Sequence, residues 1–272
     1  MIWSEEAEKA VERVPFFVRK RVRKQVEKEA EQSGSSRVSI VHVRACRERF
    51  MSGKGIDIKG HQIETCFGAG GCENRAVESA GLVEDLERLF AKRDVGGFLG
   101  RTVRSGLKMH HVFRVSVSDC PNACSRPQIV DIGIIGACRP GVSDESCTGC
   151  GACTAVCRED AIRLPGREAK DSCSESPLFD YDKCVQCGKC TRVCPSGAIR
   201  QRAEGYRILV GGKLGRHPQL GRELDGIFTE KEVLAVVNYC LDIYFANSTA
   251  GERFGAVLNR IGYDSIRPGS TT

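Results

Sequence analysis

Two cysteine runs of identical spacing within residues 147–194 constrain the fold of this chain more than any other feature. Each run has the pattern C-x2-C-x2-C-x3-C, and a proline follows the second run. A tight turn of this kind directs its first three thiolates to one [4Fe–4S] cluster, and the fourth, one helical turn further on, reaches a second cluster. The pattern therefore predicts two clusters. The ligands of one are Cys147, Cys150, Cys153 and Cys194, and those of the other are Cys157, Cys184, Cys187 and Cys190.

Zinc and disulfide arrangements explain this pattern less well. Zinc ribbons use isolated C-x2-C pairs, and disulfide frameworks belong to small secreted chains. Residues 143–200 resemble a bacterial two-cluster ferredoxin. They depart from that family at Arg158, where the pattern has proline after Cys157, which changes the local turn but removes no ligand.

The composition favours metal or redox chemistry in a reducing compartment. The 272 residues include 16 cysteines, and the first ten, MIWSEEAEKA, lack the apolar stretch of a signal peptide. No apolar run approaches the roughly 20 residues of a membrane helix. We therefore expect a cytoplasmic protein without a membrane span. The net charge of +6 suits an anionic substrate or cofactor, and since no nucleic-acid-binding motif is present we expect no nucleic-acid partner.

Hydrophobic periodicity predicts alternating helices and strands. Helical spacing of apolar residues predicts helices at 4–33 (broken at Pro15), 44–51, 75–92, 229–245 and 252–261. Alternating or continuous apolar residues predict strands at 37–43, 112–118, 129–136 and 206–210. The helix at 229 begins with a capping box, Thr229-x-x-Glu232. This alternation predicts an α/β fold.

A second set of cysteines lies outside the ferredoxin-like segment. The first pair has C-x5-C spacing, and the second has C-x3-C spacing directly after the strand expected at 112–118. The four residues are Cys66, Cys72, Cys120 and Cys124. With the later phrases IVDIGIIG and GGKLGRHPQL, they resemble the sirohaem [4Fe–4S] signature of sulfite and nitrite reductases. The resemblance implies a single sirohaem [4Fe–4S] half-module of α/β (α+β) class, in which all four cysteines hold a third cluster and Cys124 bridges to sirohaem.

The same resemblance implies a basic pocket, because sirohaem carries eight carboxylates. Basic residues in or next to the motifs are the candidates, and arginine grips a carboxylate in bidentate fashion. They are Arg75, Arg126, Lys213 and Arg216. Asn122, with Pro121, is expected to shape the turn between Cys120 and Cys124.

This chain supplies only one of the two homologous halves that form the larger enzymes, so the basic wall that faces the substrate needs another source. Basic residues that precede the first cysteine pair are the candidates within the chain: Arg44, Arg47, Arg49, Lys54, Lys59 and His61. The N-terminal helices, a second copy or another subunit are the alternatives. We therefore expect a homo-oligomer or a subunit of a complex.

The N-terminal phrase VERVPFFVRKRVRKQVEKEA resembles a small module of dark-operative protochlorophyllide reductase. The resemblance implies no catalytic residue here. The predicted domains are then a helical module at 1–36, a sirohaem/[4Fe–4S] domain in two parts at 37–140 and 204–272, and the ferredoxin-like insert at 141–203.

These resemblances imply a sulfite reductase-like enzyme. A ferredoxin-like or other donor protein would supply electrons through the two ferredoxin-type clusters to the coupled [4Fe–4S]–sirohaem centre, which would reduce sulfite to sulfide. Nitrite as the oxyanion, or a non-catalytic electron-transfer subunit of a larger complex, are the alternatives. Four cysteines have no assigned role: Cys46, Cys138, Cys173 and Cys240. Cys240 lies in an apolar helical stretch and is expected in the core.

Overall fold

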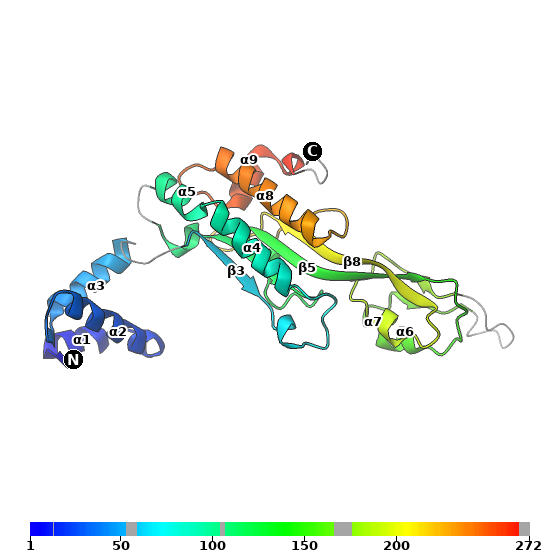
Figure 1. Ribbon diagram of the computed structural model, residues 1–272, viewed down its shortest axis with the longest axis horizontal. Coiled ribbons are helices and arrows are strands. Elements are labelled where there is room, and N and C mark those ends of the chain that lie inside the picture. The colour runs from blue at the N-terminus through cyan, green and yellow to red at the C-terminus, as the bar shows by residue number, and fades with distance from the viewer. Residues whose placement is uncertain (13, 53–58, 104–106, 166–175, 267–272) are drawn as a thin grey trace. The chain divides into compact units, whose positions relative to one another are not determined.

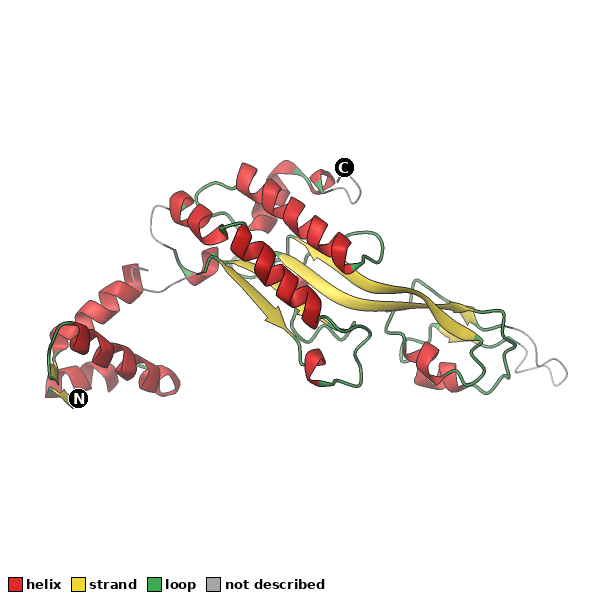
Figure 2. Cartoon of the chain, in the orientation of Figure 1, coloured by secondary structure: helices red, strands yellow, loops and turns green. Residues whose placement is uncertain are grey.

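The computed structural model describes residues 1–12, 14–52, 59–103, 107–165 and 176–266. They form two compact units, one of Met1–Ile58 with Val103–His110 and the other of Lys59–Thr102 with His111–Thr272. Helices and strands alternate along the chain, so the expected α/β class is confirmed (Figures 1 and 2). None of the described helices combines the length and the apolar character needed to span a membrane.

The first unit is a small helical module closed by two short parallel strands. Its elements are β1 (Ile2–Trp3), α1 (Glu5–Glu12), α2 (Phe16–Gln32), β2 (Arg37–Val38) and α3 (Ile40–Ser52). Its core consists of Ala7, Val26, Ala30 and Val38. Pro15 separates α1 from α2 as the sequence predicts, because proline is tolerated at a helix start but not within a helix.

The strand predicted at 37–43 is largely wrong. Pairing stops at Val38, and α3 begins at Ile40. The backbone N–H of Ser39 donates to Nδ1 of His42 at 3.0 Å, and the N–H groups of His42 and Val43 donate back to the Ser39 carbonyl. This reciprocal arrangement resembles a capping box and starts a helix where the weak alternation indicated a strand.

The second unit is built on a five-stranded sheet in the order β3-β4-β5-β8-β9. The strands are β3 (His61–Thr65), β4 (Phe113–Ser118), β5 (Ile132–Val142), β8 (Ile199–Val210) and β9 (Arg222–Glu223). The first three are parallel, and the last two are antiparallel to their neighbours. The carboxyl ends of β3 and β4 therefore lie at the same edge of the sheet.

Helices cover one face of this sheet (Figure 2). They are α4 (Ala80–Lys92), α5 (Val95–Thr102), α8 (Glu230–Asn247) and α9 (Phe254–Ile261). Aromatic rings join the layers, because Phe113 of β4 lies 5.1 Å from Tyr244 and 5.6 Å from Phe254 between ring centroids. The capping box at Thr229 and Glu232 is present at the start of α8 as predicted.

The ferredoxin-like segment lies between β5 and β8. These two strands pair over their whole length and run on beyond the sheet to the segment that holds α6 (Ala152–Val156) and α7 (Lys189–Val193) (Figure 1). Two short strands, β6 (Ile162–Arg163) and β7 (Leu178–Phe179), pair there. The segment has its own small core of Cys153, Ile162, Cys190 and Ile199.

Candidate functional site

Four cysteines gather at the carboxyl edge of the parallel strands. Thr65 pairs with Val117, so β3 and β4 end side by side. Cys66 directly follows β3, and its backbone N–H donates to the Val117 carbonyl at 3.1 Å. Cys120 follows β4 after one intervening residue. Parallel pairing therefore brings together two cysteine motifs that are far apart in the sequence.

The thiols of Cys66, Cys72 and Cys124 lie close enough to Cys120 to influence its charge state. Burial raises the pKa of Cys120, and negative charge on Cys124, Cys66 or Cys72 raises it further. The backbone N–H groups of Gly68 and Asp119 each point to Sγ of Cys66 at 3.3 Å, as suits a thiolate. Cys124 is exposed whereas Cys120 is buried, so Cys124 is the thiol open to a group outside the protein core.

Asp119, next to Cys120, holds the loop of the first cysteine pair. Its carboxylate accepts a hydrogen bond from Oγ of Ser79 at 2.5 Å, and its carbonyl accepts from the N–H groups of Ala76 and Val77. A Cβ on Gly68 would overlap the Asp119 carboxylate, so only glycine fits at this position. The Cys66–Cys72 loop is therefore shaped by close backbone approach.

Three buried serines hold the second cysteine pair against β4. Oγ of Ser125 donates to the Val117 carbonyl at 2.8 Å, and Oγ of Ser116 donates to the Ser125 carbonyl at 2.7 Å. Oγ of Ser118 lies 2.6 Å from Oγ of Ser125. The turn between Cys120 and Cys124 is thus fixed at both ends.

The insert contains two matching turns at a separation of 37 residues. Gly151 and Gly188 have φ of 77° and 68° and begin α6 and α7. The hydroxyls of Thr154 and Thr191 donate to the carbonyls of these glycines at 2.8 and 2.7 Å. Left-handed glycines at equivalent places give the two runs the same backbone path.

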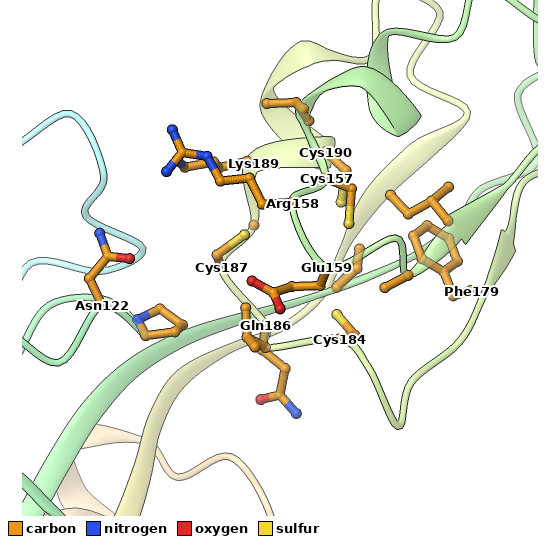
Figure 3. Close-up of a pocket in the computed structure, with 17 residues that line it drawn as sticks. Asn122, Cys157, Arg158, Glu159, Phe179, Cys184, Gln186, Cys187, Lys189 and Cys190 are labelled. Atoms are coloured by element: carbon orange, nitrogen blue, oxygen red, sulfur yellow. The ribbon is translucent and has the colours of Figure 1, made fainter.

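The fourth cysteine of the first run lies with the second run. Burial raises the pKa of Cys190 to about 12, and charges on Cys187, Cys184 and Cys157 contribute. These four cysteines border one cavity of about 140 Å³ (Figure 3). Cys157 therefore lies beside three cysteines of the second run, and the exchange of fourth ligands stays a prediction.

The other predicted ligand set of the insert is Cys147, Cys150, Cys153 and Cys194. Burial raises the pKa of Cys153, and charges on Cys147 and Cys150 add to this. Cys194 packs against the core that contains Cys153. Burial acts to raise the pKa of Cys194, but backbone hydrogen bonds at Ile199, Ser196 and Ala198 outweigh burial and lower it.

The donor sets fit [4Fe–4S] clusters. Each set offers four thiols, the ligands that such clusters require, on loops with N–H groups directed at sulfur. Within the described ranges, no three His, Cys, Asp or Glu side chains converge on a single metal ion. A cubane differs from a single ion because each of its four thiolates binds a different iron, so the ligands stand further apart.

The two cysteine regions are direct neighbours. Pro121 and Asn122, from the turn between Cys120 and Cys124, line the cavity of the insert (Figure 3). Nη1 of Arg192 on α7 donates to the Arg75 carbonyl at 2.7 Å, and the N–H of Cys138 on β5 donates to the Gln186 carbonyl at 2.7 Å. The insert is therefore joined to the sheet domain through the cluster loops themselves.

Of the predicted cofactor-binding cations, Arg75 and Arg126 lie on the loops of the two cysteine pairs, whereas Lys213 and Arg216 follow β8, whose end pairs with the start of β5. Arg126 is 71% exposed with its guanidinium 4.0 Å from Glu64, and Arg75 is 42% exposed beside Glu78. Lys213 exchanges two backbone hydrogen bonds with Gln219, and Arg216 is exposed on the turn between them. These side chains remain accessible to an anionic cofactor.

Two of the basic residues predicted to face the substrate, His61 and Lys59, lie at the other end of β3 from the cysteines. His61 lies at the start of β3, whereas Cys66 follows its end. Its ring stacks on Phe90 at 4.9 Å and lies 3.2 Å from Glu87 on the helix-covered side. The backbone of Lys59 packs against Gly96, near the same end of β3.

Two further candidates for the substrate wall have no defined place beside the cysteines. Arg44 belongs to α3 in the other compact unit. Lys54 lies outside the described residues.

Sequence reasoning missed two supporting residues. Cys138 is 4% exposed and packs against Gly188, where a Cβ would overlap its side chain. Asp119 was passed over although it directly precedes Cys120. In the sequence, only the positions of Cys138 and Asp119 beside cluster motifs indicate a role. Their contacts become visible only in the folded structure.

Comparisons with known proteins match this organisation. Residues 60–269 match the family described as the nitrite and sulphite reductase 4Fe-4S domain, and residues 3–47 match the proto-chlorophyllide reductase 57 kD subunit. The coenzyme F420-dependent sulfite reductase of Methanocaldococcus jannaschii is 38% identical over 200 residues, which are 73% of this chain and 28% of that protein. One subunit of the anaerobic sulfite reductase of Salmonella typhimurium is 30% identical over 39% of this chain and 26% of that protein.

The N-terminal module has its own relatives. One subunit of the light-independent protochlorophyllide reductase of Chlorobium luteolum is 52% identical over 48 residues, 18% of this chain and 9% of that protein.

Among solved structures, dissimilatory sulfite reductase I matches with a TM-score of 0.48 and 16% identity, covering 75% of this chain and 50% of that one. The chain spans little more than a quarter of the curated sulfite reductases it matches. Because the family match covers most of the chain, this protein belongs to the nitrite and sulphite reductase 4Fe-4S family of oxidoreductases.

Proposed function

We propose that this protein is a sulfite reductase-like enzyme in which electrons from a ferredoxin-type donor pass through two [4Fe–4S] clusters to a coupled [4Fe–4S]–sirohaem centre that reduces sulfite to sulfide. The observation that carries the proposal is the cavity that Cys157, Cys184, Cys187 and Cys190 share with Asn122. Because Asn122 lies between Cys120 and Cys124, one cluster site of the insert adjoins the four-cysteine site.

The residues divide into three ligand sets and a cofactor-binding set. Cys66, Cys72, Cys120 and Cys124 would hold the catalytic cluster, and the exposed Cys124 would link it to sirohaem. Arg75, Arg126, Lys213 and Arg216 would bind the carboxylates of sirohaem. When bound, the cofactors would relay the donor's electrons and offer the iron position at which the oxyanion is reduced.

The chain's own side chains would organise these sites. Asp119 and the serine cluster (Ser116, Ser118 and Ser125) fix the two cysteine loops, so the ligands need little rearrangement when a cluster binds. Among the wall candidates, Arg44 and Lys54 remain proposals for neutralising the oxyanion, whereas His61 and Lys59 lie at the wrong end of β3 for that role. A partner subunit or second copy is the other source of this wall.

Nitrite is the second candidate substrate, because the matching family includes both nitrite and sulphite reductases. Both reactions take six electrons. Steady oxidation of reduced viologen with each anion, measured on anaerobically purified full-length chain, separates them by their kcat/KM. A non-catalytic electron-transfer subunit would show neither activity.

The Cys124→Ser variant tests the proposed link to sirohaem, with Cys240→Ala as a matched control. Cys240 is fully buried in α8, so its loss should change neither cofactor nor rate. Cys124→Ser should change the sirohaem spectrum and lower sulfite-dependent turnover at least about 100-fold, in keeping with loss of a group that acts only in the reaction centre. A native spectrum in Cys124→Ser would contradict the assignment of Cys124 as the bridging ligand.

A further inference from the structure

An open groove lies on the ribbon formed by β5 and β8, outside the cysteine sites. Its volume is about 530 Å³, and its lining residues are Arg139, Gly141, Val142, Tyr181, Arg202 and Ala203. Two of the six are arginines and none is acidic. The groove therefore offers positive charge and one aromatic ring to an incoming molecule.

The groove and the cavity of Cys157, Cys184, Cys187 and Cys190 lie on opposite sides of the same stretch of β5. Arg139 and Gly141 line the groove, whereas Pro140 between them lines the cavity. The hydroxyl of Tyr181 donates to the Pro140 carbonyl at 3.1 Å. Tyr181 also begins the turn that leads to Cys184, whose N–H donates to the Asp180 carbonyl. Only one strand and one short turn separate a molecule in the groove from these thiols.

The two arginines are held in place without carboxylates. Cζ of Arg139 lies 4.3 Å from the ring centroid of Tyr181. Nη2 of Arg202 donates to the Val142 carbonyl at 3.0 Å, and its stem lies against Gly141, where a Cβ would overlap it. Across the described ranges, neither guanidinium forms an ion pair with an acidic side chain. Both retain donors for an external carboxylate.

The ordering of these side chains suits a binding surface. Each long arginine side chain is already restrained by a contact within the protein, so less conformational entropy is lost when it binds a partner. Beside Tyr181, Lys183 pairs with Asp180 at 3.6 Å, and Asp182 is exposed and acidic. The two arginines of the lining outnumber this one further acid, so the lining itself stays positive.

We propose that this groove docks the acidic face of a small electron-donor protein of the ferredoxin class. The proposal rests on the proposed function, in which electrons enter through the insert. Carboxylates of the donor would pair with Arg139 and Arg202, and the ring of Tyr181 would give a flat apolar contact between them. Electrons would then enter beside Cys184, on the side of the strand opposite Asn122.

The test compares two electron sources on the same full-length protein. A reduced, acidic bacterial ferredoxin probes the groove, whereas reduced methyl viologen, a small radical cation, does not need it. Arg139→Gln and Arg202→Gln should each raise the KM for ferredoxin about threefold to fivefold at low salt, and the double variant at least about tenfold, because charges at a docking surface mainly govern encounter. Sulfite turnover with viologen should stay unchanged.

Matched variants separate charge from general damage. Arg163→Gln removes an exposed arginine from β6 of the same insert and should leave the KM for ferredoxin unchanged. Arg139→Lys keeps the charge and should recover most of the affinity. Raising the salt concentration should weaken ferredoxin binding to wild type more than to the double variant.

An unchanged KM in the double variant, or an equal rise in Arg163→Gln, would overturn the groove as the docking site. A wrong proposed function would give a different result, because wild type would then not reduce sulfite with either electron source. The rate at which ferredoxin reduces the insert's clusters, measured by stopped flow, would still depend on Arg139 and Arg202 if the groove is used. Cluster reduction that is equally fast in wild type and double variant would reject the groove.

Discussion

The insert and the four-cysteine edge use the same ligand chemistry but assemble it differently. In the insert, three thiols of each set come from one continuous turn whose path depends on left-handed residues such as Gly149 and Gly151. At the edge, Cys66 and Cys120 meet only because β3 and β4 pair in parallel with one register. Local backbone shape specifies the first arrangement, and long-range packing specifies the second. The two regions should therefore respond differently to mutation.

The largest expected effect comes from removing a ligand at the edge. Cys120→Ser should lower iron from about thirteen to about eight atoms per chain, since one cubane and one haem iron are lost while two cubanes remain. Sulfite-dependent turnover should fall at least about 1,000-fold. Iron analysis with viologen kinetics measures both. Iron that stays near thirteen would show that Cys120 is not a cluster ligand, and iron well below eight would show that the two regions are not independent.

The next effect tests the exchange of fourth ligands inside the insert. Cys157→Ser combined with Cys184→Ser should disrupt one cluster, with a loss of about four irons, whereas Cys157→Ser combined with Cys150→Ser should disrupt both, with a loss of about eight. The two double variants differ only in the second site, so each serves as the control of the other. The reverse order of losses would mean that each run keeps its own four thiolates.

The next effect is on stability and concerns the packing at the amino ends of β4 and β5. Arg253 holds the buried carboxylate of Asp131 with two hydrogen bonds, Nε to Oδ1 at 3.1 Å and Nη2 to Oδ2 at 2.6 Å. Arg253→Met leaves that charge buried and unpaired, which should lower the free energy of unfolding by roughly 3–5 kcal/mol. Denaturant titration of the protein measures this change.

The pH dependence of the same variant provides its control. Burial raises the pKa of Asp131, and Arg253 and the N–H groups of Arg114 and Phe254 counteract this. Without Arg253, the pKa of Asp131 in the folded state rises further, so protonation of Asp131 favours the folded state. The difference in free energy of unfolding between wild type and Arg253→Met should therefore narrow as the pH falls from 7 towards 5. The double variant Asp131→Asn with Arg253→Met should lose less stability than Arg253→Met alone. A loss of free energy of unfolding that does not depend on pH would point to lost packing of the Arg253 side chain instead.

The smallest effect is expected at the start of α8. Thr229→Ala removes the side chain that accepts from the N–H of Glu232, which should lower stability by about 1 kcal/mol. Thr229→Ser keeps the oxygen and should lose little. Thr229 starts α8, outside the cysteine motifs, so iron content should not change in either variant.

The pKa of Glu232 predicts how the effect of Thr229→Ala on stability depends on pH. Hydrogen bonds from Thr229 lower that pKa, so the stabilisation is present at neutral pH and is lost as the pH falls through the lowered value. The difference between wild type and Thr229→Ala should therefore shrink in acid. A difference that stays constant would assign the effect to helix propensity.

Local signals predicted the elements that local chemistry decides. The strict alternation at 112–118 gave β4, and Thr229 with Glu232 gave the start of α8. The cysteine spacing predicted that Cys157 serves the second run. Cys157 lines the same cavity as Cys184, Cys187 and Cys190, but its role as a ligand stays a prediction.

Elements decided by distant partners were not predicted. β3, HQIET, is short and shows little alternation, so its parallel pairing with β4 was missed, and with it the side of the sheet that His61 faces. α5 carries three glycines, which disfavour a helix until packing of Val95 and Leu99 stabilises it. β5 and β8 extend beyond the predicted 129–136 and 206–210 because each continues only as the partner of the other.

The pairing of β5 with β8 has a consequence for how such proteins diversify. The insert leaves the sheet at Val142 and returns at Ile199, and these two residues are strand partners. Adjacent partners in an antiparallel ladder lie roughly 5 Å apart, a gap that a tight hairpin turn closes. The ferredoxin-like segment could thus be added, lost or replaced without changing the register of β5 and β8, but its contacts with Asn122 and Arg75 would change with it.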